Sequence, residues 1–163
     1  MVDRLWDTTF ASRIRPDSSL FDYAVSESRQ GRPVPIAAPS LTEMFYGIEL
    51  KAMSGDRRFG VLRDWLVRLI GSQVLNVISL DGRAAVIAGR LRAENPHPPP
   101  GRDSRSKTMR QAAWLFDIQI AAVAFAAGLD VATRNIRDFE ELSASLERLY
   151  PGAPTLAVYP DFR

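Results

Sequence analysis

The sequence predicts an α/β protein with one mostly parallel sheet of four to five strands and helices on both faces. Short apolar runs alternate along the chain with longer amphipathic or Ala-rich segments, and this alternation is typical of parallel α/β folds. The length of 163 residues fits a single domain over residues 1–163. The 46% hydrophobic and 25% charged residues are those of an ordinary globular protein.

The expected elements follow from apolar periodicity and from turn and cap residues. Gly55 and Gly71 end two central helices, Asp81 is the N-cap of a third, and Gly128 ends a fourth. The predicted order is strand 4–7, turn 8–10, helix 20–25, strand 35–38, helix 40–50, helix 59–69, strand 74–78, helix 81–92, loop 95–106, helix 114–127, strand 129–133, helix 138–149 and strand 155–159.

The most informative residue is Asp117, which interrupts the Ala-rich apolar run 114–127. The composition of this run predicts a helix that is buried on nearly all sides. An ionised carboxylate inside such a helix is costly unless it is paired or metal-bound. Asp117 is therefore a candidate site residue.

Further polar residues are expected at the carboxyl edge of the sheet, where open α/β sheets place their sites. Asp7 follows the first strand, Glu43 lies in the helix after the second, and Asn135 and Asp138 follow the strand 129–133. Local structural roles explain two of these residues equally well: Asp7 as a turn or N-cap residue, and Glu43 as the partner of Ser40 in a capping box.

A cluster of these carboxylates requires a cation. Two carboxylates about 4 Å apart repel each other by about 4 kcal/mol at an effective dielectric constant of 20. The chain has no cysteine and one histidine, His97, so thiolate and His-rich metal sites are excluded. Oxygen ligands alone favour Mg²⁺, with Mn²⁺ as the second choice.

Four motifs resemble those of PIN-domain proteins, above all the VapC toxins of VapBC toxin–antitoxin pairs. They occur in family order between residues 7 and 139, and the last two together are the specific ones. The motifs are Asp7-Thr-Thr, Ser40-Leu-Thr-Glu43-Met-Phe-Tyr-Gly47, Asp117-Ile-Gln-Ile-Ala-Ala122 and Thr133-Arg-Asn-Ile-Arg-Asp138-Phe139.

The resemblance implies a PIN-like three-layer fold and a metal-dependent endoribonuclease that acts as the toxin of a type II toxin–antitoxin system. It makes Asp7, Glu43 and Asp117 metal-binding acids, and Asn135 and Asp138 share the fourth position. Thr9 is expected to hold either the reactive water or a ligand carboxylate. For Arg134, and equally for Arg137, two roles stay open: a contact to a phosphate oxygen, or a salt bridge to Asp117 or Asp138.

The chain departs from a compact VapC in a Pro-rich, basic insertion at about residues 95–110. Seven basic residues against two acidic ones lie between residues 83 and 110, the one locally basic segment. We predict RNA phosphate contacts for four side chains of the insertion, Arg102, Arg105, Lys107 and Arg110. A solvated loop and a dimer contact are the alternatives.

Large apolar residues in the region 44–69 exceed what one helical face needs, and they predict a homodimer that binds a small VapB-like antitoxin there. No signal peptide or membrane-spanning run is evident, so a cytoplasmic location is expected. Two other functions compete with the nuclease: a catalytically silent PIN-like module that binds nucleic acid or antitoxin, and a phosphatase-like α/β domain with Asp7 as nucleophile. The latter fits poorly, because Thr9 stands where a second acid is needed.

Overall fold

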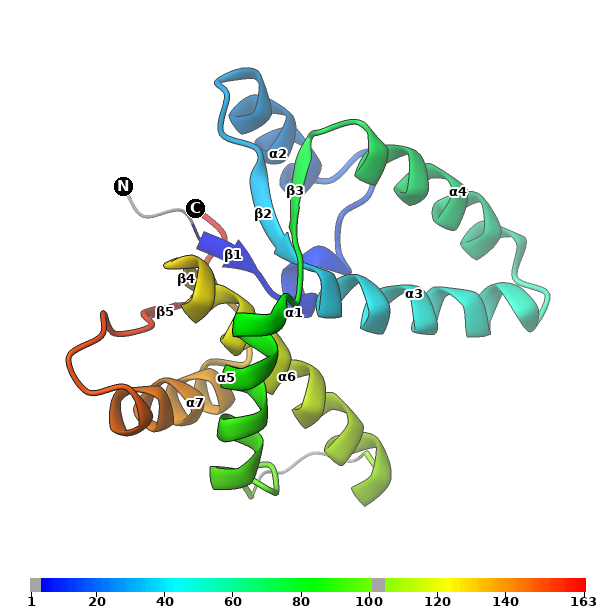
Figure 1. Cartoon of the computed structure of the whole chain (residues 1–163). Coiled ribbons are helices and arrows are strands. Elements are labelled where there is room, and N and C mark those ends of the chain that lie inside the picture. The colour runs from blue at the N-terminus through cyan, green and yellow to red at the C-terminus, as the bar shows by residue number, and fades with distance from the viewer. Residues whose placement is uncertain (1–3, 101–104) are drawn as a thin grey trace.

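A five-stranded, fully parallel sheet lies between two layers of helices (Figure 1). The computed structural model describes residues 4–100 and 105–163. The strand order is β3-β2-β1-β4-β5, so β1 is central. The strands are β1 Arg4–Trp6, β2 Val34–Ala37, β3 Leu75–Ile78, β4 Asp130–Ala132 and β5 Val158–Tyr159. The predicted α/β architecture is confirmed.

Helices follow the strands as the sequence predicts, and most of their ends differ by a few residues. The helix predicted over 114–127 differs more, because it begins seven residues earlier, at Lys107. The helices are α1 Thr8–Ala11, α2 Ser19–Arg29, α3 Ala38–Met53, α4 Arg57–Gly71, α5 Gly82–Glu94, α6 Lys107–Ala127 and α7 Ile136–Leu149. None of those in the described part of the chain is long and apolar enough to cross a membrane.

Two hydrophobic cores lie on opposite faces of the sheet, because neighbouring strand residues point to opposite sides. Leu5 belongs to the core formed with α5, α6 and α7, whereas Trp6 belongs to the core formed with α1 to α4. Val131 and Ala132 alternate in the same way. The alternation produces the three layers.

The second half of helix α6 contains most of its buried residues, within the run whose composition predicts burial. Trp114, Ile118 and the run from Ile120 to Ala124 are all buried. Gly128 ends the helix with φ of 69°, a left-handed conformation that glycine adopts without steric strain. Asp117 therefore lies in the middle of the most buried helix.

Three local predictions are wrong. Residues 8–10 form the short helix α1 instead of a turn, because the Asp7 side chain accepts a hydrogen bond from the Thr9 backbone and caps it. Helix α3 begins at Ala38 with Pro39 in its first turn, so Ser40 lies inside the helix and the capping box does not form. The last strand is only Val158–Tyr159, because it pairs only with the two-residue end of β4.

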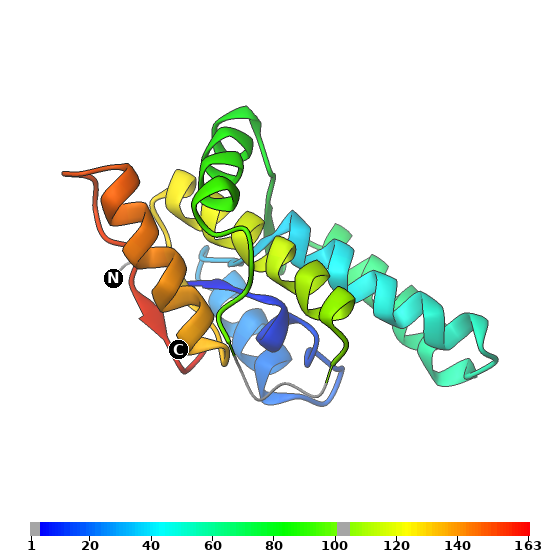
Figure 2. The same cartoon turned by 90° about the horizontal axis from the view of Figure 1, so that it is seen from below.

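Helices α3 and α4 form a hairpin that extends away from the sheet (Figures 1 and 2). Their inner faces are buried through Met44, Ile48, Leu66 and Leu69. Helices α5, α6 and α7 pack against one another, and α3 of the hairpin contacts α6.

Candidate functional site

Asp7 ends the central strand and is only 1% exposed. One carboxylate oxygen accepts hydrogen bonds from the Thr9 backbone at 2.9 Å and from the Thr9 hydroxyl at 2.6 Å. The other accepts from the Thr133 hydroxyl at 2.6 Å. Burial raises the pKa of Asp7 to about 6, although these hydrogen bonds oppose the rise. Of the two predicted roles of Thr9, it adopts that of holding a carboxylate.

Residues directly after β4 extend the hydrogen-bond network that begins at Asp7. The Thr133 hydroxyl accepts from the Asn135 backbone at 2.9 Å, and the Thr9 hydroxyl accepts from the Arg134 backbone at 2.9 Å. The Asn135 side-chain amide donates to Asp117 at 3.1 Å and to Asp138 at 2.8 Å. Asn135 thus ties the acid of α6 to the acid of α7.

Asp117 is the electrostatic centre of this group. Burial is the largest of the causes that raise its pKa well above the usual value, and the charges of Asp7, Glu43 and Asp138 add to the rise. The Arg105 guanidinium acts in the opposite direction. Three acids from other segments therefore lie within electrostatic reach of Asp117.

Glu43 projects from the second turn of α3 and is half-buried. Burial raises its pKa, while the Thr8 hydroxyl and Arg105 lower it. The Thr8 hydroxyl is buried and has no hydrogen-bond partner of good geometry among the described residues, and the same holds for the Ser40 hydroxyl. Two unsatisfied hydroxyls beside an acid are unusual in a protein interior and are expected where a site takes up a ligand or water.

A pocket of about 200 Å³ opens at Asp117. Asn135, Asp138 and Arg137 form one side of it, whereas the Pro-rich segment and the start of α6 form the other through Pro98, Pro99, Pro100, Arg105 and Arg110. Arg137 forms no ion pair among the described residues, and the same holds for Arg134, whose guanidinium lies 5.8 Å from the Phe10 ring. Lys107 is exposed at the first position of α6, and Arg102 lies outside the described residues.

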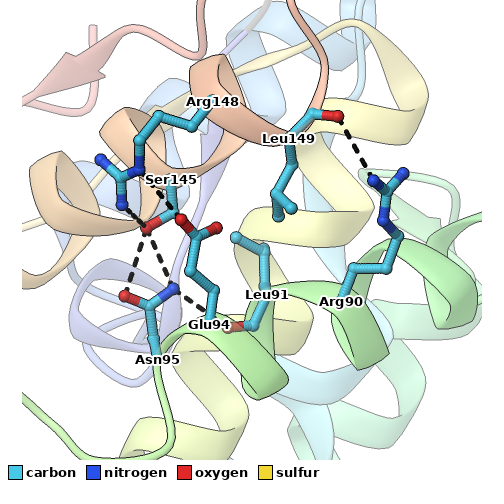
Figure 3. A network of polar contacts seen from close by, with 7 residues as sticks. All are labelled: Arg90, Leu91, Glu94, Asn95, Ser145, Arg148 and Leu149. Atoms are coloured by element: carbon cyan, nitrogen blue, oxygen red, sulfur yellow. Dashed lines mark hydrogen bonds and ion pairs between the residues drawn. The ribbon is translucent and has the colours of Figure 1, made fainter.

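The Pro-rich segment is anchored at its start by Asn95, which links α5 to α7 (Figure 3). Its amide nitrogen donates to the Leu91 carbonyl and to the Ser145 hydroxyl, both at 3.0 Å. Its backbone carbonyl accepts from the Trp114 indole of α6 at 2.9 Å. These contacts fix the segment beside the helix that carries Asp117.

Comparisons with known proteins assign the fold. No family model and no curated protein matches the chain. A solved chain of the DNA-bound VapBC complex of Salmonella typhimurium matches with a TM-score of 0.55 and 23% identity over 97% of both chains. A chain of FitAcB of Neisseria gonorrhoeae matches with a TM-score of 0.58 and 21% identity over 95% of both chains.

The chain has a PIN-like fold. A third match supports the same conclusion: VapBC2 of Rickettsia felis, bound to a DNA fragment from its promoter, has a TM-score of 0.58 and 19% identity over 95% of this chain. The resemblance that the four motifs indicate is therefore confirmed at the level of the fold.

Within this PIN-like fold, the donor chemistry fits a hard divalent cation. Asp7, Glu43, Asp117 and Asp138 supply carboxylate oxygens, and the Thr8 hydroxyl is buried without a good partner. In the conformation described for residues 4–100 and 105–163, no three acidic or histidine side chains are close enough to hold one ion together. Asn135 directs its amide nitrogen at the acids, so its place is to orient them.

Three participants were missed by the sequence reasoning. Thr133 is fully buried and joins Asp7 to Asn135, and the signal for it is a hydroxyl residue at the last position of a strand, directly before a polar run. Thr8 and Ser40 have no comparable signal, because their surroundings depend on how α1 packs against α3.

Proposed function

We propose that this chain is a metal-dependent endoribonuclease and the toxin of a type II toxin–antitoxin pair. The observation that carries the proposal is the placement of Asp117 in a buried helix within electrostatic reach of three other acids. Strongly perturbed carboxylates that line a pocket mark candidate functional sites. The PIN-like fold and the four motifs support the same activity.

Asp7, Glu43 and Asp117 would hold Mg²⁺, with Mn²⁺ as a substitute, and Asp138 would complete the acidic group. A bound divalent ion supplies a water of lowered pKa and stabilises negative charge on a phosphate. Thr9 and Thr133 fix the Asp7 carboxylate through both oxygens, and Asn135 orients Asp117 and Asp138. The phosphatase alternative lacks its second acid, because Thr9 stands at that position.

RNA is the proposed substrate, and basic side chains surround the pocket on the side of the Pro-rich segment. Arg105 and Arg110 line it, and we propose that they contact phosphates together with Lys107 and Arg102. Arg134 is exposed beside Thr9 and is placed to contact a phosphate as well.

An antitoxin is the proposed protein partner, because the similar structures are VapBC and FitAB complexes. Tyr46, Leu50 and Met53 are 67%, 51% and 82% exposed, and their spacing places them on one face of α3. Of the large apolar residues in the region 44–69, Tyr46 is exposed, whereas Leu66 lies in the core and Trp65 packs against it. We propose the α3 face as the antitoxin surface and a homodimer as the assembled form.

The decisive experiment compares RNA cleavage by the wild-type protein, Asp117→Asn and Glu140→Gln with and without Mg²⁺. We expect Asp117→Asn to lower the rate about 100-fold or more, since the site loses an anionic ligand. Glu140→Gln removes an exposed acid of α7 and is the matched control. Chelation of the metal should stop cleavage by the wild type.

A catalytically silent module is the second candidate, and one observation favours it: no three acids of the described residues are close enough to hold an ion as they stand. Titration with Mn²⁺ separates the two. A nuclease binds the ion through Asp117, whereas a silent module binds RNA or antitoxin equally well with and without metal. Unchanged cleavage by Asp117→Asn would contradict the proposed mechanism.

A further inference from the structure

We propose that Arg105 is a resident cation of the acidic pocket, which a divalent ion has to displace before it binds. The proposal rests on the proposed function and concerns the regulation of the same site. It assigns to the Pro-rich insertion a role in metal affinity that is separate from any contact with RNA.

Arg105 lies in the pocket itself. Together with Asp117, Asn135 and Asp138 it lines the same space of about 200 Å³. Its charge acts on two acids from different helices, since it lowers the pKa of both Asp117 and Glu43. One guanidinium therefore lines the pocket with Asp117 of α6 and lies within electrostatic reach of Glu43 of α3.

The acids need a positive charge when no metal is bound. Asn135 donates to Asp117 and Asp138, but a neutral amide does not balance two half-buried carboxylates. A guanidinium is always charged and is less strongly hydrated than an ammonium group, so it suits a partly buried acidic pocket. Arg105 fulfils this role from within the chain.

Arg105 and a divalent ion exclude each other in so small a space, because both are attracted by the same carboxylates and repel one another. The base of the segment is fixed by the contacts of Asn95, by Trp114 and by a hydrogen bond of 2.9 Å from the Gln111 side chain to the Pro96 carbonyl. Arg105 is an exposed residue that lies two positions before the start of α6, so its long side chain has room to leave the pocket.

Calorimetric titration of the full-length, metal-free protein with Mn²⁺ tests the displacement. We expect Arg105→Ala to bind Mn²⁺ about 5- to 10-fold more tightly than the wild type, a coupling of ordinary size between two ligands of one site. Arg105→Lys keeps the charge and should stay near the wild type. Arg92→Ala removes the same charge from an exposed position at the end of α5 and should have no effect.

A thermal double-mutant cycle without metal provides a second readout. Arg105→Ala should lower the Tm by about 2–4 °C in the wild-type background and by much less in the Asp117→Asn background. Equal losses in both backgrounds would overturn the role of Arg105, and so would an unchanged Mn²⁺ affinity in Arg105→Ala. Failure of every variant to bind Mn²⁺ would instead overturn the nuclease function and the displacement with it.

Discussion

At the scale of single residues, Asp7 shows how a buried carboxylate is kept ready for a ligand. Thr9 and Thr133 supply three donors to it, yet burial still raises its pKa to about 6. The hydrogen bonds therefore fix the geometry of the carboxylate without making its ionised form stable. A bound cation would remove the remaining penalty, which is how an acid in a metal site differs from an ordinary N-cap.

The metal-free protein should become less stable as the pH rises from about 4 to 6. In this range the folded state holds a proton on Asp7 that the unfolded state has released, because the pKa is about 6 when folded and 3.8 when unfolded. The full penalty, present above pH 6, is about 3 kcal/mol at most. Urea unfolding between pH 4 and 7 measures it.

Asp7→Asn should reduce this pH dependence, to which Asp117 and Glu43 also contribute because their pKa values are raised as well. Asp130→Asn is a control at the opposite end of the sheet. Since metal binding requires the ionised acid, Mn²⁺ affinity of the wild type should rise with pH through the same window. A stability curve with the same slope in Asp7→Asn and the wild type would show that other groups cause it.

At the scale of elements, the sequence correctly predicts the end of a helix where a single residue, such as an N-cap or a terminal glycine, determines it. Asp81 caps α5 by accepting from the Ala84 backbone at 2.8 Å, and Gly128 ends α6 with positive φ, both as predicted. The predicted start of α3 was wrong. The spacing of Ser40 and Glu43 fits a capping box, but the helix already begins at Ala38 and Pro39, directly after β2. Tertiary packing, which buries Ser40, outweighs the local signal.

Substitutions on the exposed face of α3 test whether this face binds the antitoxin. Replacing Leu50 and Met53 together by Lys should weaken the complex with a VapB-like antitoxin about 30- to 100-fold, since exposed apolar anchors carry much of such binding. The stability of the free protein should change by no more than about 0.5 kcal/mol. Titration of the purified partner measures the affinity.

Val86→Lys is the matched control, because Val86 is an equally exposed apolar residue on α5, away from the hairpin. Loss of binding in both variants, or in neither, would place the antitoxin elsewhere. The apolar pattern of the region 44–69 includes Tyr46, but which of its residues are exposed is seen only in the structure, because the pattern does not say which side of α3 faces α4.

At the scale of the whole molecule, the acidic group exists because of the strand order. Asp7, Glu43, Asp117 and Asp138 are far apart in the sequence, and the central position of β1 brings the ends of β1 and β4 together with α3 and α6. This convergence follows from the rule for parallel sheets, so it was predictable. The bridging of two acids by Asn135 was not, because it depends on the side-chain geometry after β4.

The distribution of charge leads to the last prediction. The net charge is only +2, whereas the insertion is locally basic and enters the helix of Asp117. If its side chains contact RNA phosphates, each contact on a single strand contributes about 0.7 to the slope of log affinity against log salt concentration. Replacing Arg102, Lys107 and Arg110 by Ala should therefore lower the slope by about 2.

Arg105 is left intact in this variant, so that its role in the acidic pocket does not enter the measurement. Binding is measured in the Asp117→Asn background to prevent cleavage. Replacing three exposed Arg residues elsewhere, Arg29, Arg57 and Arg92, controls for net charge. If both triple variants lower the slope equally, the attraction is a property of the whole surface; if only the insertion variant does, the insertion is a phosphate clamp beside Asp117.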